Sequence, residues 1–227
     1  MYYDPMISKL ITWGPTREDS MKILDRAFDE YVIQGLTHNI GFGKSILANR
    51  NFWNGDYSTD FIPNFYPDGF TGDNLSHDDH VLLSVAAHHV KNIHNGHGSK
   101  DPSSKHEKVF FISIDELRDH PKRDLRVEDL GSGKFKLTDL TTQKEDIVDT
   151  ENFEFDYNAL VTMNLNGKDQ ILQFSEVAND ALSYKFYLKG NHVNLKVFSE
   201  EQMNLSHHMP VPAKIDYAKS IMSPMPG

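Results

Sequence analysis

The sequence predicts an α+β fold, in which a short α/β region precedes an antiparallel β-barrel of about eight strands around one long helix. Three observations support this fold class. The first 50 residues alternate strand-like and helix-like patterns, residues 76–94 form one strongly apolar helix, and short runs of alternating polarity follow Lys108. Many short strands in succession are typical of a barrel or a sandwich. A barrel also offers the apolar helix an interior in which to be buried.

The N-terminal region is expected to begin with a buried strand over residues 7–13. Thr16 then provides a helix N-cap, and the apolar residues after it recur at helical spacing. A second short strand is predicted at residues 31–33. Thr37 or Asn39 is expected to cap the next helix, so that this region reads strand, helix, strand, helix.

The middle of the chain is predicted to hold a connector and the long helix. Residues 49–75 are rich in turn residues and in aromatic side chains. A connector with this many aromatic side chains should pack across a surface. Ser76 is expected to cap the helix 76–94, and Asn95-Gly96 to end it. A hydrophilic loop is then predicted over residues 95–107.

The barrel is expected over residues 108–200. The dipeptides Asn166-Gly167 and Gly190-Asn191 predict two-residue hairpin turns. Residues 201–222 lose periodicity and are predicted to be an exit linker. The candidate strands are Val109–Ile114, Asp124–Glu128, Lys134–Thr138, Asp146–Val148, Asn152–Phe155, Leu160–Leu165, Gln170–Phe174, Leu182–Leu188 and Val193–Phe198.

Composition narrows the classes of partner. The formal net charge of −10 argues against nucleic acid, because phosphate binding needs a clustered cationic surface. No apolar run approaches the roughly 18 residues of a membrane-spanning helix. The sequence has no cysteine, which excludes disulfides, thiolate catalysis and cysteine-ligated zinc within it. We therefore expect neither a nucleic-acid partner nor a membrane partner.

The motifs that could carry chemistry favour structural roles. His77 and His80 lie at i, i+3 in a histidine-rich stretch, but a metal site usually adds a third ligand, so no metal ligand is assigned. Residues 41–45 end in Gly-Lys-Ser, as a P-loop does, but a P-loop also needs a glycine at the position of His38. Close packing of helices explains Gly41 and Gly43 better than phosphate binding does. No serine lies in a Gly-x-Ser-x-Gly elbow. No catalytic or cofactor-binding residue is assigned.

Five segments carry recognisable motifs: Tyr2–Ile11, Gly35–Ile40, Gly55–Ile62, Tyr66–Gly72 and the closing Ser223–Gly227, which reads Ser-Pro-Met-Pro-Gly. These segments resemble the alpha subunits of biotin-dependent acyl-CoA carboxylases. Tyr66–Gly72 looks specifically like those of the propionyl-CoA carboxylase type, whereas residues 108–200 agree in strand pattern more than in identity.

The resemblance implies a domain organisation and an activity for the parent protein. The parent would carboxylate propionyl-CoA to methylmalonyl-CoA, with ATP, biotin and Mg or Mn. Residues 1–64 would be the C-terminal part of a biotin carboxylase domain. Residues 65–205 would be a biotin-transfer (BT) domain, with helix 76–94, hook-like loop 95–107 and barrel 108–200. Residues 206–227 would be a linker leading to a biotinyl domain.

The resemblance also implies partners. The barrel would couple the biotin carboxylase to a carboxyltransferase beta subunit, and the chain's other partners would be its own biotin carboxylase and biotinyl domains. The family's ATP loop and its Ala-Met-Lys-Met biotinylation motif are not in this sequence. The chain alone is therefore expected to bind no cofactor and to be inactive. Residues 1–64 are expected to be poorly ordered in solution, because the apolar faces of this part of the domain would lack the partner that covers them. The residues expected to contact the beta subunit are His94, His97, Lys100, Pro102, Lys105 and His106.

Two alternatives stay open. The chain could belong to an alpha subunit that acts on methylcrotonyl-CoA or on a range of acyl-CoA substrates, because acyl choice resides in the beta subunit. It could also be a free-standing barrel that binds a small ligand, which a helix filling the barrel would exclude. The resemblance implies the mitochondrial matrix for a eukaryotic source and the cytoplasm for a bacterial one.

Overall fold

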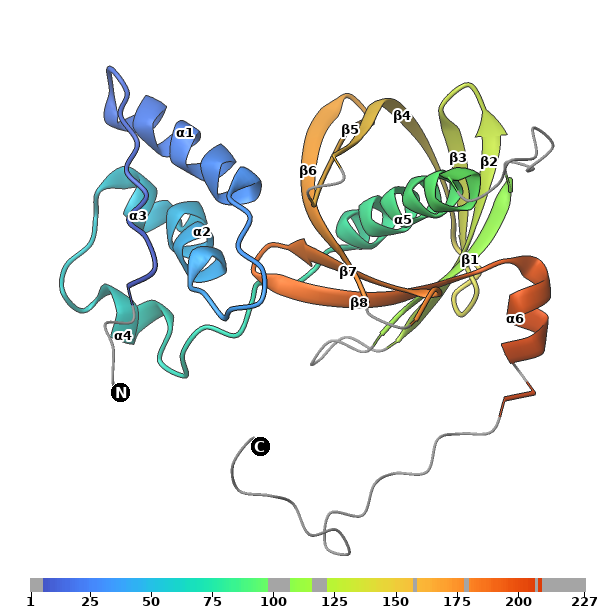
Figure 1. The fold of residues 1–227 in the computed structure, drawn as a ribbon. Helices are drawn as coiled ribbons and strands as arrows, with labels where there is room; N and C mark the ends of the chain where they lie inside the picture. The colour runs from blue at the N-terminus through green and yellow to red at the C-terminus, as the bar shows by residue number, and fades with distance from the viewer. Residues whose placement is uncertain are drawn as a thin grey trace, which may run out of the picture.

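The computed structural model describes residues 6–97, 107–115, 122–156, 159–177, 180–206 and 208–209. Residues 6–75, here called the helical unit, lie beside a β-barrel that encloses a long helix, α5 (His77–His97) (Figure 1). Within these described ranges, no helix is both long and apolar enough to cross a membrane. The other helices are α1 (Arg17–Glu30), α2 (Ile40–Ala48), α3 (Arg50–Asn54), α4 (Phe61–Phe65) and α6 (Glu200–Ser206).

The helices of the N-terminal region begin where the sequence predicts. Thr16 is the N-cap of α1, and its Oγ1 accepts a hydrogen bond from the Asp19 N–H at 3.1 Å. Asn39 is the N-cap of α2, although its side chain makes no capping hydrogen bond. The aromatic connector contains the short helices α3 and α4, and Phe42 of α2 packs edge-on against Tyr66, with ring centroids 5.0 Å apart. The expected packing of the connector is thus confirmed.

The two strands predicted in this region are wrong. Residues 7–13 and 31–33 are not strands, because neither segment pairs with a described strand in a hydrogen-bonded ladder. Side chains tie the first segment to α1 instead. The hydroxyl of Thr12 donates to the Ser20 carbonyl at 3.0 Å, and the hydroxyl of Ser20 donates to the Thr12 carbonyl at 3.0 Å.

The barrel confirms the predicted fold class. Eight antiparallel strands pair in chain order and close between β1 and β8, where Ile112 pairs with Val197. Inward residues alternate with outward ones along most strands, as in the buried-exposed alternation of β8. The strands are β1 (Val109–Ile114), β2 (Arg123–Gly131), β3 (Lys134–Asp139), β4 (Glu145–Asp156), β5 (Leu160–Leu165), β6 (Lys168–Glu176), β7 (Ser183–Leu188) and β8 (Asn191–Phe198).

Two details of the barrel differ from the prediction. The candidate strands at 146–148 and 152–155 are one strand, β4, whose register with β5 shifts between Glu151 and Glu154. Asn152 has a φ of 51° at this irregularity, which is why the polarity pattern is interrupted there.

The hairpin between β7 and β8 is also shifted by one residue. Its two turn residues are Lys189 and Gly190, with φ of 50° and 77°, and Asn191 already belongs to β8. A type I′ turn needs a positive φ at both central positions, and glycine takes the second with little strain. The other predicted hairpin, at Asn166-Gly167, is confirmed, with φ of 51° and 80°.

The core of the barrel is built around α5. Leu83, Val85 and Val90 of the helix are 0% exposed, and so are Phe110 and Phe186 of the strands that surround it. These side chains belong to one continuous apolar cluster. The predicted central helix is therefore confirmed, and a barrel with an open ligand cavity along its axis is excluded.

The prediction that residues 201–222 form an exit linker without periodic structure is wrong for residues 201–206, which are helical. Residues 200–206 form α6, which packs near β1 and β8. Ser199 and Gln202 form a capping box, in which the Gln202 N–H donates to Ser199 Oγ at 3.2 Å and the Ser199 N–H donates to Gln202 Oε1 at 2.9 Å. This short capping signal is present in the sequence.

Candidate functional site: the two ends of helix α5

The C-terminal end of α5 is joined to the start of β1 by the side chain of Asn92. Its Nδ2 donates to the Glu107 carbonyl at 3.1 Å, and its Oδ1 accepts from the Glu107 N–H at 3.1 Å. The next carbonyl, that of Lys108, lies 3.3 Å from Nε2 of the buried His88. The amide of Asn92 thus supplies the donor and acceptor pair that a neighbouring strand would supply. It fixes the chain on both sides of residues 98–106.

Lys91 is buried at the same end of the barrel. Only 8% of the residue is exposed, and its Nζ donates to the Ala181 carbonyl at 3.0 Å. Burial lowers the pKa of Lys91, against the opposing attraction of Glu107 and Asp180. Burial also raises the pKa of Glu107, against the attraction of Lys91. This lysine therefore ties α5 to the connection between β6 and β7 while it faces the carboxylate at the start of β1.

His94 lies beside this lysine. Its Nδ1 is 3.3 Å from the hydroxyl of Tyr184, and its Nε2 is 3.5 Å from the Glu176 carboxylate. Burial, together with the charge of Glu176, raises the pKa of Tyr184 to about 12, so the phenol stays protonated at neutral pH. Lys91, His94, Glu176 and Tyr184 line a pocket of about 540 Å³ at this mouth of the barrel.

Of the predicted contact residues, the structure places two. His94 lies at the mouth just described, and His97 is the last residue of α5. Lys100, Pro102, Lys105 and His106 lie outside the described residues. Their contact with a second subunit stays a prediction.

The N-terminal end of α5 meets the β7–β8 turn. Nζ of Lys189 lies 2.8 Å from Oδ2 of Asp79, and the Ser76 N–H donates to the same oxygen at 2.7 Å. Burial opposes ionisation of Asp79, but the hydrogen bonds from Lys189 and Ser76 outweigh it and lower the pKa of this carboxyl group. The expected capping by Ser76 is confirmed, since its Oγ accepts from the Asp79 N–H at 3.2 Å.

The helical unit packs closely against the barrel at the same turn. A Cβ on Gly41 would lie 2.3 Å from the Cα of Gly190 and 2.7 Å from the hydroxyl of Tyr187. A Cβ on Gly43 would lie 3.0 Å from the ring of Phe28 on α1. Both glycines of the segment 41–45 therefore serve close packing, as the sequence predicts, because no larger residue fits at Gly41 without moving the two parts.

Hydrogen bonds to the backbone fix the helical unit on β6. Nε2 of Gln173 donates to the carbonyl oxygens of Asp29 at 3.1 Å and of Tyr31 at 3.3 Å. Nε2 of Gln34 donates back to the Phe174 carbonyl at 3.4 Å. Gln173 is 7% exposed, so its bonds are largely shielded from water.

A further hydrogen bond joins β8 to the connector, where Nδ2 of Asn191 donates to the Asp73 carbonyl at 2.6 Å. Asn191 is 2% exposed. Together with Gln173 and Gln34, this residue holds the helical unit and the barrel in one fixed arrangement.

Metal and phosphate sites find no support among the described residues, where no three His, Asp or Glu side chains are grouped as metal ligands. His77 Nε2 lies 2.7 Å from Oδ2 of Asp146, and His80 Nδ1 lies 2.7 Å from the Ser76 carbonyl, so the two rings have different partners. Lys44, the lysine of the Gly-Lys-Ser segment, forms ion pairs with carboxylates of α1.

Comparisons with known proteins find relatives of the chain. The family described as the biotin carboxylase C-terminal domain matches residues 1–64. A mitochondrial propionyl-CoA carboxylase alpha chain from Sus scrofa is 47% identical over 88 residues, which are 38% of this chain and 12% of the pig chain. A propionyl-CoA carboxylase alpha chain from Ruegeria pomeroyi is 27% identical over 242 residues, covering 100% of this chain and 33% of that one.

A relative with a different named substrate also matches. The mitochondrial methylcrotonoyl-CoA carboxylase subunit alpha from Dictyostelium discoideum is 36% identical over 104 residues, which are 46% of this chain and 15% of that subunit. This chain spans about a third of the length of the Ruegeria relative, which matches it throughout. The chain is therefore similar over its whole length to propionyl-CoA carboxylase alpha chains, at 27% identity to the Ruegeria chain, and its residues 1–64 match the biotin carboxylase C-terminal domain family.

Proposed function

We propose that this chain is the coupling part of a propionyl-CoA carboxylase alpha chain. In this proposal the biotin-transfer domain, residues 65–205, holds the biotin carboxylase region, residues 1–64, at one end of α5. The loop at the other end contacts a carboxyltransferase beta subunit. Residues 206–227 lead towards a biotinyl domain.

The observation that supports the proposal is that the contact with the helical unit and the base of the predicted loop lie at opposite ends of one helix. Asp79 lies at the end that meets the helical unit, and His94 lies at the mouth next to the predicted loop. Because a helix rises 1.5 Å per residue, these two residues are about 22 Å apart along the axis. Since α5 is packed inside a closed barrel, the barrel can act as a spacer of fixed length.

A fixed spacer suits a reaction that is divided between two centres. The parent enzyme would carboxylate biotin with ATP and Mg or Mn at one centre and transfer the carboxyl group to propionyl-CoA at the other. Holding both centres on one scaffold raises the effective concentration of the carrier at each of them. The residues of this chain would supply position rather than chemistry, so the chain alone should be inactive.

The second candidate is the same coupling role in a methylcrotonyl-CoA carboxylase or in a carboxylase of broader acyl range, which the Dictyostelium relative favours. The location would follow the source: the mitochondrial matrix in a eukaryote, as the word mitochondrial in the pig protein's name suggests, and the cytoplasm in a bacterium.

A pull-down decides between these candidates. The immobilised chain is offered purified beta subunits of the propionyl-CoA and the methylcrotonyl-CoA enzymes in separate experiments. We expect retention of the propionyl type above a bare-resin control. Retention of the methylcrotonyl type alone would support the second candidate, and retention of neither would contradict the coupling role.

A further inference from the structure

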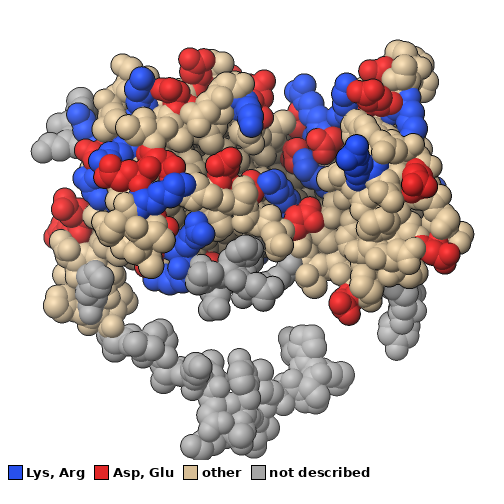
Figure 2. Space-filling view, turned by 180° about the vertical axis from the view of Figure 1, so that it is seen from behind, with Lys and Arg blue, Asp and Glu red and all other residues tan. Residues whose placement is uncertain are grey.

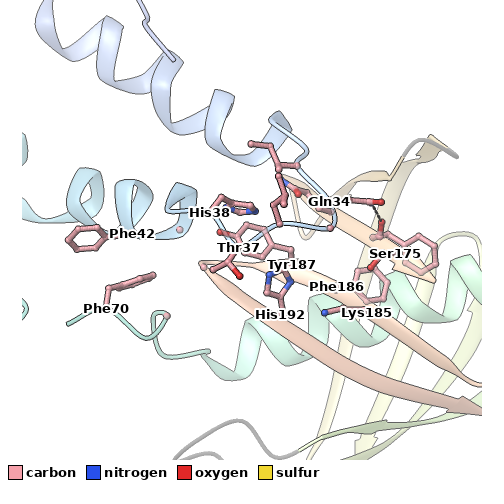
Figure 3. A pocket seen from close by; sticks show the side chains of 18 of the residues that line it. Gln34, Thr37, His38, Phe42, Phe70, Ser175, Lys185, Phe186, Tyr187 and His192 are labelled. Atoms are coloured by element: carbon pink, nitrogen blue, oxygen red, sulfur yellow. Dashed lines mark hydrogen bonds between the residues drawn. The ribbon is translucent and has the colours of Figure 1, made fainter. Parts of the chain in front are cut away.

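Three rings meet where the helical unit lies on the outer face of the barrel. His38, from the loop before α2, packs edge-on against Tyr187 of β7, with ring centroids 5.6 Å apart. His192 of β8 packs against the same tyrosine, with centroids 4.9 Å apart, and lies 6.5 Å from His38. Figure 3 shows both histidines beside the tyrosine ring. The rings line a cleft of about 690 Å³ between the two parts of the molecule.

The cleft holds nothing that would balance a positive charge on these rings. Among the described residues that line it there is no carboxylate, and its one lysine or arginine is Lys185. The neighbouring elements do carry carboxylates, but Asp29 of α1 is ion-paired with Lys44, and Oδ1 of Asp73 accepts a hydrogen bond from Ser45 at 2.8 Å. Figure 2 shows that Lys, Arg, Asp and Glu side chains are interspersed on the face of the molecule opposite to that of Figure 1. No carboxylate therefore lines the cleft itself, and Asp29, whose charge acts on Tyr187, is ion-paired with Lys44.

The surroundings of both rings disfavour the charged form. Burial lowers the pKa of His38 and outweighs its backbone hydrogen bond to Ile33. Burial also lowers the pKa of His192, and the positive charges of Lys185 and His38 add to that effect. His38 Nδ1 is shielded from water and has no hydrogen-bond partner among the described residues. Burial raises the pKa of Tyr187, which stays neutral throughout the acid range.

We propose that the His38–Tyr187–His192 cluster makes the attachment of the helical unit to the barrel sensitive to acid. When both histidines are protonated, two positive charges face each other beside Lys185 with no carboxylate in the cleft. The ring of His38 is half-buried at this contact and gains by moving into water when it is charged, whereas His192 is already exposed and acts by repelling it. The helical unit therefore leaves the barrel face while the barrel stays folded. This behaviour concerns the junction alone and does not depend on the coupling role.

The direction of the effect follows from linkage. A histidine whose pKa is lower in the attached state binds its proton more tightly in the detached state. The attachment is therefore at full strength above the ordinary histidine pKa of about 6.5. The attachment weakens as the pH falls below this value and through the lowered pKa values of His38 and His192.

A direct test is possible because the sequence has no cysteine, so that spin labels attach only to cysteines introduced for the purpose. Cysteines replace Lys22 on α1 and Lys144 beside β4, whose side chains are 62% and 57% exposed. Distances between two nitroxide labels are then measured by pulsed electron resonance at pH 7.5 and at pH 5.0. We expect one narrow distribution at pH 7.5 and a second, longer population at pH 5.0, with the circular dichroism of the barrel retained.

Two variants in the labelled background separate the cluster from other effects of acid. The double variant His38→Gln with His192→Gln should keep the narrow distribution at both pH values. The matched control His208→Gln, at an exposed position outside the cleft, should respond to acid as the parent does. An unchanged distribution in the parent at pH 5.0 would overturn the proposal. So would a double variant that responds like the parent.

Discussion

The side-chain amide of Asn92 pairs with both backbone groups of Glu107, 15 residues further along the chain. Both hydrogen bonds are 3.1 Å long, and they close the base of the loop whose tip is proposed to contact a beta subunit. The relationship joins the end of the buried helix to the start of the first barrel strand. It makes the loop base part of the rigid barrel rather than a flexible attachment.

Changing Asn92 to aspartate should destabilise the barrel by about 1–3 kcal/mol, because the donor is lost and a carboxylate then faces the Glu107 carbonyl. Urea unfolding followed by circular dichroism measures this change. Asn95→Asp, at an exposed position on the same helix, is the control and should alter stability little. Equal changes in the free energy of unfolding for the two substitutions would show that the paired hydrogen bonds of Asn92 do not stabilise the barrel.

Leu83→Ala should cost about 2–5 kcal/mol of unfolding free energy, because it removes a large side chain from the filled interior of the barrel. Leu83 is 0% exposed, whereas Ile147 on β4 is 66% exposed. The substitution Ile147→Ala is therefore the matched control, with an expected change near zero. If both variants unfold at the same urea concentration as the parent, α5 does not fill the barrel.

Gly41→Ala should loosen the helical unit without unfolding the barrel, because the new methyl group would meet Gly190 and the Tyr187 hydroxyl. Overpacking of this kind typically costs about 1–3 kcal/mol. Amide hydrogen exchange should show faster exchange in α1 and α2 and unchanged exchange in the strands. Gly96→Ala, where an added Cβ meets nothing within 4 Å, serves as control. Slow exchange in α1 and α2 of the Gly41 variant would contradict the close contact.

The extended segment before α1 should exchange its amides freely. Ile11 is 78% exposed and Trp13 is 80% exposed, and no described strand pairs with the segment. Fast exchange over residues 7–13 and red-shifted fluorescence of Trp13 in a Trp53→Phe background are the expected results. Full protection of these amides would show that the apolar face is covered in solution and would contradict poor order in this part of residues 1–64.

Local signals predicted much of the fold. The bounds of β1 and β5, Val109–Ile114 and Leu160–Leu165, follow from alternation and from flanking turn residues. The cap at Thr16 follows from residue type and spacing. Alternation also placed the strands around the one apolar helix, and the need to bury that helix favoured a closed barrel over an open sheet.

Features that depend on a distant partner escaped prediction. Residues 7–13 have the apolar pattern of a strand, but a strand forms only where another chain segment completes its hydrogen bonds. Asn92 is one more polar residue on a long helix, and nothing in its neighbourhood indicates that Glu107 returns to it. The same holds for Gln173, whose partners Asp29 and Tyr31 lie more than 140 residues earlier.

The most direct test of the coupling role is the assembly of the chain with a carboxyltransferase beta subunit before and after the loop 95–107 is shortened between residues 98 and 106, so that Asn92 and Glu107 keep their hydrogen bonds. Light scattering on a size-exclusion column reports the complex, and urea unfolding reports the barrel. We predict that the parent chain forms the complex and that the shortened chain does not, while the unfolding midpoint of the barrel is unchanged. Undiminished assembly of the shortened chain would contradict the account.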